Sequence, residues 1–196
     1  MIVSEFVRGR RMDNREKILE ATIRVFNRKG LKLTMDDIAS ELSMSKKTIY
    51  TVFKDKESLF GEMVDYCFDK IKESEIKIIC DKNMTTMEKI RAVLGVLPEG
   101  YREIDYSKLY CLKSKYPKIY NKVEYRLQSG WESTINLIKQ GISEGVVRPI
   151  NINVFKTMME STIGQFFQRD VLIRNDISYV DALEEVVNIL VDGIRV

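Results

Sequence analysis

Histidine is absent from this 196-residue sequence. Its absence excludes the zinc sites that use imidazole ligands and removes the commonest general base of enzymes. The sequence also has no glycine-rich phosphate loop, no plausible set of metal ligands and no nucleophile–base motif. We therefore predict a protein that is not an enzyme and that needs no cofactor and no metal.

The sequence contains few cysteines, and their spacing matches no paired-cysteine motif. The three cysteines are Cys67, Cys80 and Cys111, and none of them belongs to a CxxC motif. We interpret them as buried apolar thiols in a reducing compartment. A redox-sensing thiol is the alternative, and it requires an exposed side chain with a lowered pKa.

Proline and glycine are few, at 3 and 10 residues, so long loops are not expected. No segment has the run of about 18 apolar residues that a membrane span requires. The N-terminus becomes charged without the apolar stretch of a signal peptide. The expected location is the cytoplasm, with no membrane partner.

Apolar residues recur at helical spacing along most of the chain, and no strand pattern is present. Capping pairs predict several helix starts: Asp13 with Glu16, Thr34 with Asp37, and Thr85 with Glu88. We predict an all-α fold of about nine helices. They include residues 13–29, a helix-turn-helix within 34–53, 56 to about 79, 85 to 98, 101–113, 117 to about 144, and two amphipathic helices around 155–167 and 180–194.

Positive charge is concentrated at the N-terminal end. Residues 1–60 contain 13 Lys and Arg against 9 Asp and Glu, a balance of +4, whereas the rest of the chain has a balance of −1. A basic segment of this kind is where an anionic partner would be met. The asymmetry is mild, so the function must be argued from motifs.

Residues 34–53 have the pattern of a helix-turn-helix. Ala39 is the small residue that allows the second helix to cross closely, and apolar residues that include Ile38 and Ile49 hold the pair together. Ser43 stands at the tight turn, where glycine is commonest. If Ser43 adopts a left-handed backbone conformation, we expect a cost of roughly 1 kcal/mol relative to glycine.

The second helix of this motif presents hydrogen-bond donors at its N-terminal end. That end also carries exposed backbone N–H groups and the positive end of the helix dipole, both of which favour phosphate. Lysine suits phosphate or guanine, threonine suits phosphate or the thymine methyl group, and a tyrosine phenol reaches the backbone. The candidate residues are Ser45, Lys46, Lys47, Thr48 and Tyr50, with Lys56 opening the next helix as a phosphate clamp.

The stretch LTMDDIASELSMSKKTIYTVFKDKESLF, preceded by the helix ILEATIRVFNRKG, resembles the DNA-binding domain of the tetracycline-repressor (TetR) family. The resemblance covers residues 13–60. It implies that residues 1–55 form a domain that binds a double-stranded operator, and that residues 56–196 form a helical domain for dimerisation and effector binding. It also implies the DNA-contact residues: Thr34, Ser45, Lys46, Lys47, Thr48, Tyr50 and Lys56.

This sequence departs from the family pattern at three positions. Lys47 replaces a common glycine, and Thr51 and Val52 stand where an aromatic residue or histidine often contacts the DNA backbone. The base preference of relatives is therefore not transferable. The family pattern further implies a homodimer through the last two helices, and packing of these helices within the monomer is the alternative. Gly164 would allow a partner helix to approach or would serve ordinary packing.

The effector site is less defined by the sequence. Apolar walls with a few phenols are typical of such cavities, and they suggest an apolar or aromatic small molecule. The candidate lining residues are Tyr66, Tyr110, Tyr125, Trp131, Met159 and Phe167, although ordinary core packing is the simpler interpretation of each. No acid or arginine within an apolar stripe stands out as a countercharge.

The sequence thus predicts a ligand-responsive transcriptional regulator, most simply a repressor that binds a palindromic operator. Two alternatives belong to other classes: an enzyme on a helical scaffold, and an adaptor that keeps the helix-turn-helix for protein contacts. Turnover of a candidate ligand would favour the enzyme, and loss of retention on nonspecific DNA at low salt would favour the adaptor.

Overall fold

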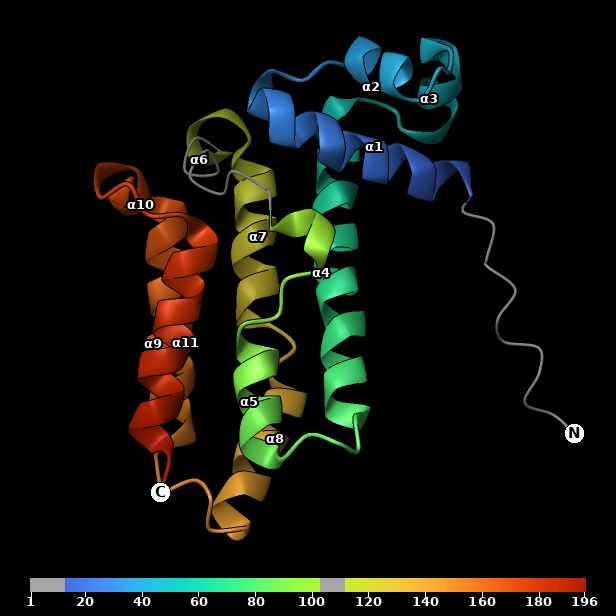
Figure 1. Ribbon diagram of the computed structural model, residues 1–196. Helices are drawn as coiled ribbons and strands as arrows, with labels where there is room; N and C mark the ends of the chain where they lie inside the picture. Colours follow the sequence, from blue (N-terminus) through green and yellow to red (C-terminus); the bar gives the residue numbers. More distant parts are fainter. Residues whose placement is uncertain (1–12, 103–111) are drawn as a thin grey trace, which may run out of the picture. The chain divides into compact units, whose positions relative to one another are not determined.

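The computed structural model describes residues 13–102 and 112–196. Its contacts group the chain into two units that divide between Met63 and Val64. Within the described ranges the regular elements are helices, and the single pairing of extended segments is a bridge between Val147 and Arg195. The prediction of an all-α fold is confirmed (Figure 1).

The first unit contains three helices and the beginning of a fourth. They are α1 (Asn14–Lys29), α2 (Met35–Glu41), α3 (Lys46–Val52) and α4 (Lys56–Cys80), with a 3-10 turn, η1 (Gly30–Lys32), after α1. The apolar face predicted for the first helix is buried. The core of the unit is formed by almost fully buried side chains: Ile18, Val25, Leu33, Ile38, Ile49, Phe53, Leu59 and Phe60.

Polar side chains begin these helices at the predicted positions. Asp13 Oδ1 accepts a hydrogen bond from the backbone N–H of Glu16 at 2.8 Å. Thr34 and Asp37 form a capping box at α2, and Ser45 caps α3. Each cap satisfies a backbone N–H that has no partner within its helix, and is typically worth about 1 kcal/mol.

Among its described residues, the second unit combines the rest of α4 with five longer helices and two single-turn helices. The longer ones are α5 (Thr86–Leu94), α7 (Pro117–Gln128), α8 (Glu132–Ser143), α9 (Ile152–Gln168) and α11 (Tyr179–Ile194); the single turns are α6 (Leu112–Lys115) and α10 (Val171–Arg174). In Figure 1, α9 and α11 run side by side. The two predicted C-terminal helices are confirmed, and α10 between them is an addition.

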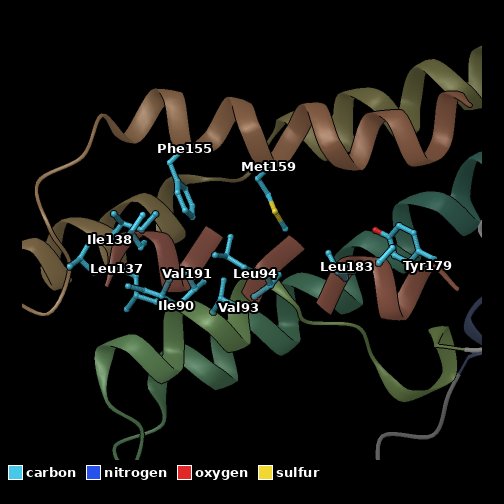
Figure 2. Packing of buried hydrophobic residues seen from close by; sticks show 14 of the residues in the cluster. Ile90, Val93, Leu94, Leu137, Ile138, Phe155, Met159, Tyr179, Leu183 and Val191 are labelled. Atoms are coloured by element: carbon cyan, nitrogen blue, oxygen red, sulfur yellow. The ribbon is translucent and has the colours of Figure 1, made fainter. Parts of the chain in front are cut away.

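The core of the second unit lies between α5, α8, α9 and α11. Figure 2 shows Phe155 and Met159 pointing from α9 toward the side chains of α5 and α11. Ile90 and Val191 at the centre of this cluster are completely buried. Apolar faces at helical spacing therefore meet here as their sequence periodicity predicts.

The predicted helix from 117 to 144 is wrong in one respect, because it is two helices. The break falls at residues 129–131, where Gly130 has a left-handed backbone with φ of 74°. The carbonyl of Trp131 then begins α8 by accepting the N–H of Ile135 at 2.8 Å. Apolar residues on either side remain in helical phase, so periodicity alone predicts one continuous helix.

The helix predicted for residues 101–113 falls mainly on residues 103–111, which lie outside the described ranges. Before them, a 3-10 turn, η2 (Glu99–Tyr101), follows the predicted stop at Pro98. None of the helices that the structure describes is both long and apolar enough to cross a membrane.

The cysteines differ from the prediction of uniformly buried thiols. Cys80, at the end of α4, is exposed, and Cys67 is partly buried. Burial raises the pKa of the Cys67 thiol to about 12, and a hydrogen bond with Tyr101 offsets this only in part. A thiol that stays protonated is a poor nucleophile, so Cys67 does not have the properties of a redox sensor. Cys111 lies outside the described residues.

Candidate DNA-binding surface and ligand cavity

The turn between α2 and α3 is tight and left-handed. Ser43 has φ of 51°, as expected for the position where glycine is commonest. The backbone N–H of Met44 donates to the carbonyl of Ala39 at 2.9 Å, which closes the turn. Ala39 is buried and Ile49 is completely buried, so the two helices are fixed against the core.

The outward face of α3 carries polar and basic side chains. Lys46, Lys47, Tyr50 and Thr51 are exposed, whereas Ile49 points into the core. This division follows from helical spacing, because a single buried position in a short helix leaves the remaining faces to solvent. The surface therefore has the shape and the donor groups that a DNA groove requires.

The two lysines of α3 differ in their surroundings. Lys46 Nζ donates to Asp36 Oδ2 at 2.7 Å, and this hydrogen bond raises the pKa of Lys46. Lys47 forms no ion pair with any residue of the described ranges. Lys47 thus presents a full positive charge to an incoming phosphate, whereas the charge of Lys46 is partly matched by Asp36.

Four other candidate contacts already bond within the protein. The Thr34 hydroxyl caps α2, and the hydroxyls of Ser45 and Thr48 lie 2.8 Å apart at the start of α3. Lys56 Nζ donates to the carbonyl of Leu31 at 3.0 Å and to that of Leu33. These groups hold the surface in place, and a role in DNA contact would have to be shared with that bonding.

Ion pairs fasten α1 to α2. Glu41 accepts from Arg24 Nε at 2.9 Å and also pairs with Arg28, which lowers its pKa. Asp37 pairs with Lys29. The pKa of Asp37 falls to about 2, first because of the hydrogen bond from Lys29 and then because of those from Thr34.

The second unit contains a partly open cavity of about 120 Å³ that is lined by residues of α4, α5, α7, α8, α9 and α11 and of the segment joining α7 to α8. Its walls are mostly apolar. The apolar lining includes Phe68, Ile71, Val93, Leu94, Leu97, Leu127, Trp131, Met159, Ile163 and Leu183. A cavity of this character suits a small ligand with an apolar body.

An ion pair borders the cavity. Lys72 Nζ lies 2.9 Å from Glu75 Oε1 and 2.7 Å from Glu75 Oε2, and 2.7 Å from the carbonyl oxygen of Gly130. Glu75 is only 8% exposed. Burial raises the pKa of Glu75, and the hydrogen bond from Lys72 opposes that rise.

The candidate effector residues are only partly brought together. Trp131 and Met159 line the cavity, but Phe167 packs against Tyr179 with ring centroids 5.4 Å apart and does not line it. Tyr125 is 70% exposed. Tyr66 is partly buried on α4, outside the cavity lining, and Tyr110 lies outside the described residues.

Sequence reasoning missed Lys72 and Glu75, although a signal exists. Phe68, Ile71, Glu75 and Ile78 follow one another at helical spacing on α4. Glu75 therefore interrupts an apolar stripe, which is the pattern of a charged group that faces a packed interior.

Known proteins resemble the chain both in the DNA-binding segment and over its whole length. Residues 18–63 match the family described as "Bacterial regulatory proteins, tetR family". The uncharacterized HTH-type transcriptional regulator YvaF of Bacillus subtilis is 26% identical over 91% of this chain and 94% of its own length. IcaR of Staphylococcus aureus, a negative transcriptional regulator of the biofilm operon icaADBC, is 28% identical over 59% of this chain and 64% of its own.

A similar fold is found in a crystal structure of the transcriptional regulator FadR from Bacillus subtilis in complex with stearoyl-CoA. It has a TM-score of 0.53 and 19% identity, and the match covers 91% of this chain and 98% of that one. With the helix-turn-helix geometry, the family match shows that this chain carries, at residues 18–63, the DNA-binding domain of the TetR family of transcriptional regulators.

Proposed function

We propose that this regulator binds a palindromic operator as a homodimer, represses transcription there, and leaves the operator when a small molecule fills the cavity of the second unit. The observation that carries the proposal is the outward face of α3, which buried Ile49 fixes and which presents exposed Lys47, a lysine with no ion pair among the described residues. Repression is supported by the similarity to IcaR, a negative regulator.

The DNA contacts proposed for the recognition surface are Thr34, Ser45, Lys46, Lys47, Thr48, Tyr50 and Lys56. Among them, Lys47 and Tyr50 are exposed and have the clearest access to DNA. We propose residues 1–55 as the DNA-binding domain and residues 56–196 as the effector-binding and dimerisation domain. Leu59 and Phe60 of α4 pack into the core of the first unit, which explains why its contacts extend to Met63.

Dimerisation through α9 and α11 is supported by apolar side chains that the single chain leaves exposed. Val154 and Met158 on α9 are 55% and 51% exposed, and Ile189 on α11 is 63% exposed. These residues border one groove of about 420 Å³. An apolar surface shared by two neighbouring helices is suited to the same surface of a second copy, which would form a four-helix interface.

Regulation by a ligand is supported by the apolar cavity and by the similarity in fold to FadR with its bound stearoyl-CoA. A ligand that binds better to the form unable to match both half-sites weakens DNA binding through linkage. The regulator would act in the cytoplasm, where its DNA partner lies.

Selection of bound sequences from a random DNA pool tests the proposal directly. We expect a palindrome whose half-sites are separated by about one helical turn or a multiple of it. Binding that stays equal on selected and scrambled DNA contradicts sequence-specific regulation. Failure to bind any duplex at low salt would instead favour the adaptor alternative.

A further inference from the structure

The ammonium group of Lys72 occupies a site with three acceptors. They are the two carboxylate oxygens of Glu75, at 2.9 and 2.7 Å, and the carbonyl oxygen of Gly130, at 2.7 Å. A primary ammonium has three N–H donors, so the number of acceptors matches the number of donors. The site is therefore built for one primary ammonium group at the wall of an apolar cavity.

Gly130 makes room for this group. A Cβ atom at residue 130 would lie 2.8 Å from Lys72 Cε and 3.2 Å from Lys72 Nζ, so the end of the lysine side chain would have to shift. The φ of 74° at Gly130 turns its carbonyl into the site and is itself unfavourable for other residues. Glycine at this position therefore leaves room for the end of the Lys72 side chain beside the carbonyl.

Lys72 and Glu75 differ in how easily each side chain can move out of the site into water. The side chain of Glu75 is 10% exposed, whereas that of Lys72 is 35% exposed. A long lysine stem can carry its charged end into water, but the shorter and more buried glutamate cannot. Lys72 is therefore the displaceable member, and Glu75 is the fixed one.

We propose that the effector of this regulator is a compact primary amine, whose ammonium group replaces that of Lys72 on Glu75 and on the Gly130 carbonyl while its apolar body fills the cavity. The proposal rests on the proposed function, because it names the ligand class of the same cavity. A quaternary ammonium has the same charge but no N–H, so it cannot make these three bonds.

Charge balance favours a cation over an anion. Exchanging one ammonium for another keeps Glu75 paired, whereas a carboxylate ligand would place a second negative charge beside it. The other cations near the cavity already have partners. Arg126 lies 2.6 Å from Asp69, and Lys156 lies 3.6 Å from Glu160.

The size of the cavity limits the body of the ligand. At about 120 Å³ it is slightly smaller than an engineered 150 Å³ cavity that holds benzene. A single ring or a short branched chain therefore fits. Phe68, Trp131 and Met159 supply the apolar and aromatic contacts for such a group.

Displacement of Lys72 also removes a link between two elements. Lys72 belongs to α4, and its bond to Gly130 joins α4 to the turn between α7 and α8. The beginning of α4 contributes Leu59 and Phe60 to the core of the DNA-binding unit. A ligand that releases Lys72 thus acts on a helix whose residues are divided between the two units.

The test uses four probes that share a phenyl ring and differ in their head group: benzylamine, benzyltrimethylammonium, benzyl alcohol and benzoate, with isobutylamine and isobutanol as an aliphatic pair. Dissociation constants are measured by calorimetry on the full chain at neutral pH. We expect the primary amine of a series to bind at least about tenfold more tightly than its matched alcohol, quaternary ammonium or acid. The Glu75→Gln variant should lose that preference and keep its affinity for the alcohol.

Glu73→Gln is the matched control, because Glu73 pairs with Lys70 at the same spacing on α4 but is 55% exposed. It should bind the amines as the unaltered protein does. The proposal is overturned if no primary amine binds better than its matched alcohol, if benzoate binds more tightly, or if Glu75→Gln keeps the preference. Should Glu75→Gln not fold, the probe series on the unaltered protein decides alone.

Operator binding is measured separately in the presence of the same probes. Amines that bind through Glu75 without weakening operator binding would support the ligand class and contradict release by the ligand. Operator release by stearoyl-CoA, with no amine bound, would support ligand-induced release and overturn the amine proposal.

Discussion

Ser43 holds the turn of the helix-turn-helix in a left-handed conformation that glycine adopts more easily. Replacing Ser43 with glycine should raise the free energy of unfolding by up to about 1 kcal/mol, because the relief of backbone strain exceeds the extra entropy of the unfolded chain. Urea denaturation measures the change. Ser40→Gly, at an exposed position in the last turn of α2, should instead lower stability, and equal effects at both positions would contradict the strain at Ser43.

Lys47 is the residue at which DNA binding should depend most clearly on one charge. Lys47→Ala should weaken operator binding and reduce the slope of log K against log salt by about 0.9 for each phosphate that the lysine neutralises. Lys46→Ala is less simple to interpret, since it also uncovers the carboxylate of Asp36. Fluorescence anisotropy at several salt concentrations gives the slope, with exposed Lys139→Ala as the control. An unchanged slope for Lys47→Ala would remove α3 from the interface.

The carboxylate of Asp37 makes the stability of the first unit depend on pH in the acidic range. Its pKa of about 2 lies below the usual 3.8, so its carboxylate stabilises the fold above pH 3.8 and this stabilisation disappears as the pH falls through 2. The melting temperature of Asp37→Asn should therefore be lower than that of the unaltered protein at pH 6, and the difference should shrink toward pH 2. A difference that is constant across this range would contradict a role for the charge.

At the scale of the helices and their connections, Lys56 bonds to the backbone of the segment between α1 and α2. Lys56 donates to the carbonyls of Leu31 and Leu33 and lies 5.1 Å from the centre of the Phe60 ring. Lys56→Met should lower the free energy of unfolding by about 1.5–3 kcal/mol, the usual worth of hydrogen bonds from a charged donor. Lys54→Met, at an exposed position, is the control.

The same pair of variants separates the two roles open to Lys56. A loss of stability with an unchanged salt slope assigns it to holding the segment. A shallower salt slope with unchanged stability assigns it to a phosphate clamp instead.

Helix starts were predictable because their chemistry is local. Thr34 with Asp37 and Thr85 with Glu88 need only three residues of chain to form their capping boxes. The break at Gly130 was not predictable from periodicity, since the apolar residues of α7 and α8 stay in phase across it. A single glycine in a helical pattern is compatible with either outcome, and the contact with Lys72 decides it here.

The burial of side chains around the ligand cavity was likewise not predictable from local sequence patterns. Lys70 with Glu73 and Lys72 with Glu75 have identical spacing, yet Glu73 is 55% exposed and the side chain of Glu75 is 10% exposed. Glu75 lines the cavity together with Ser129, Gly130 and Trp131, which lie far away in the sequence. The sequence therefore predicted the DNA-binding motif in detail, but only Trp131 and Met159 of the cavity lining.

For the whole molecule, assembly should depend on the apolar surface of α9 and α11. Ile189→Asp should weaken dimerisation by about 30-fold or more, because a charge at the centre of an interface typically costs about 2 kcal/mol or more. Light scattering after size exclusion measures the mass. Ile76→Asp, at a similarly exposed position on α4, should leave the mass unchanged. A dimer that survives Ile189→Asp would place the interface elsewhere.

The ion pairs of the first unit also bear on how quickly the protein finds its operator. Arg24 and Arg28 share Glu41, and Lys29 and Lys46 have their own carboxylates, so many of the cations already face a carboxylate and the net charge of residues 1–60 is only +4. Long-range attraction speeds association only in proportion to the field that remains. The search should therefore proceed with weak electrostatic steering and short residence on unrelated DNA, which leaves discrimination to the close contacts of α3.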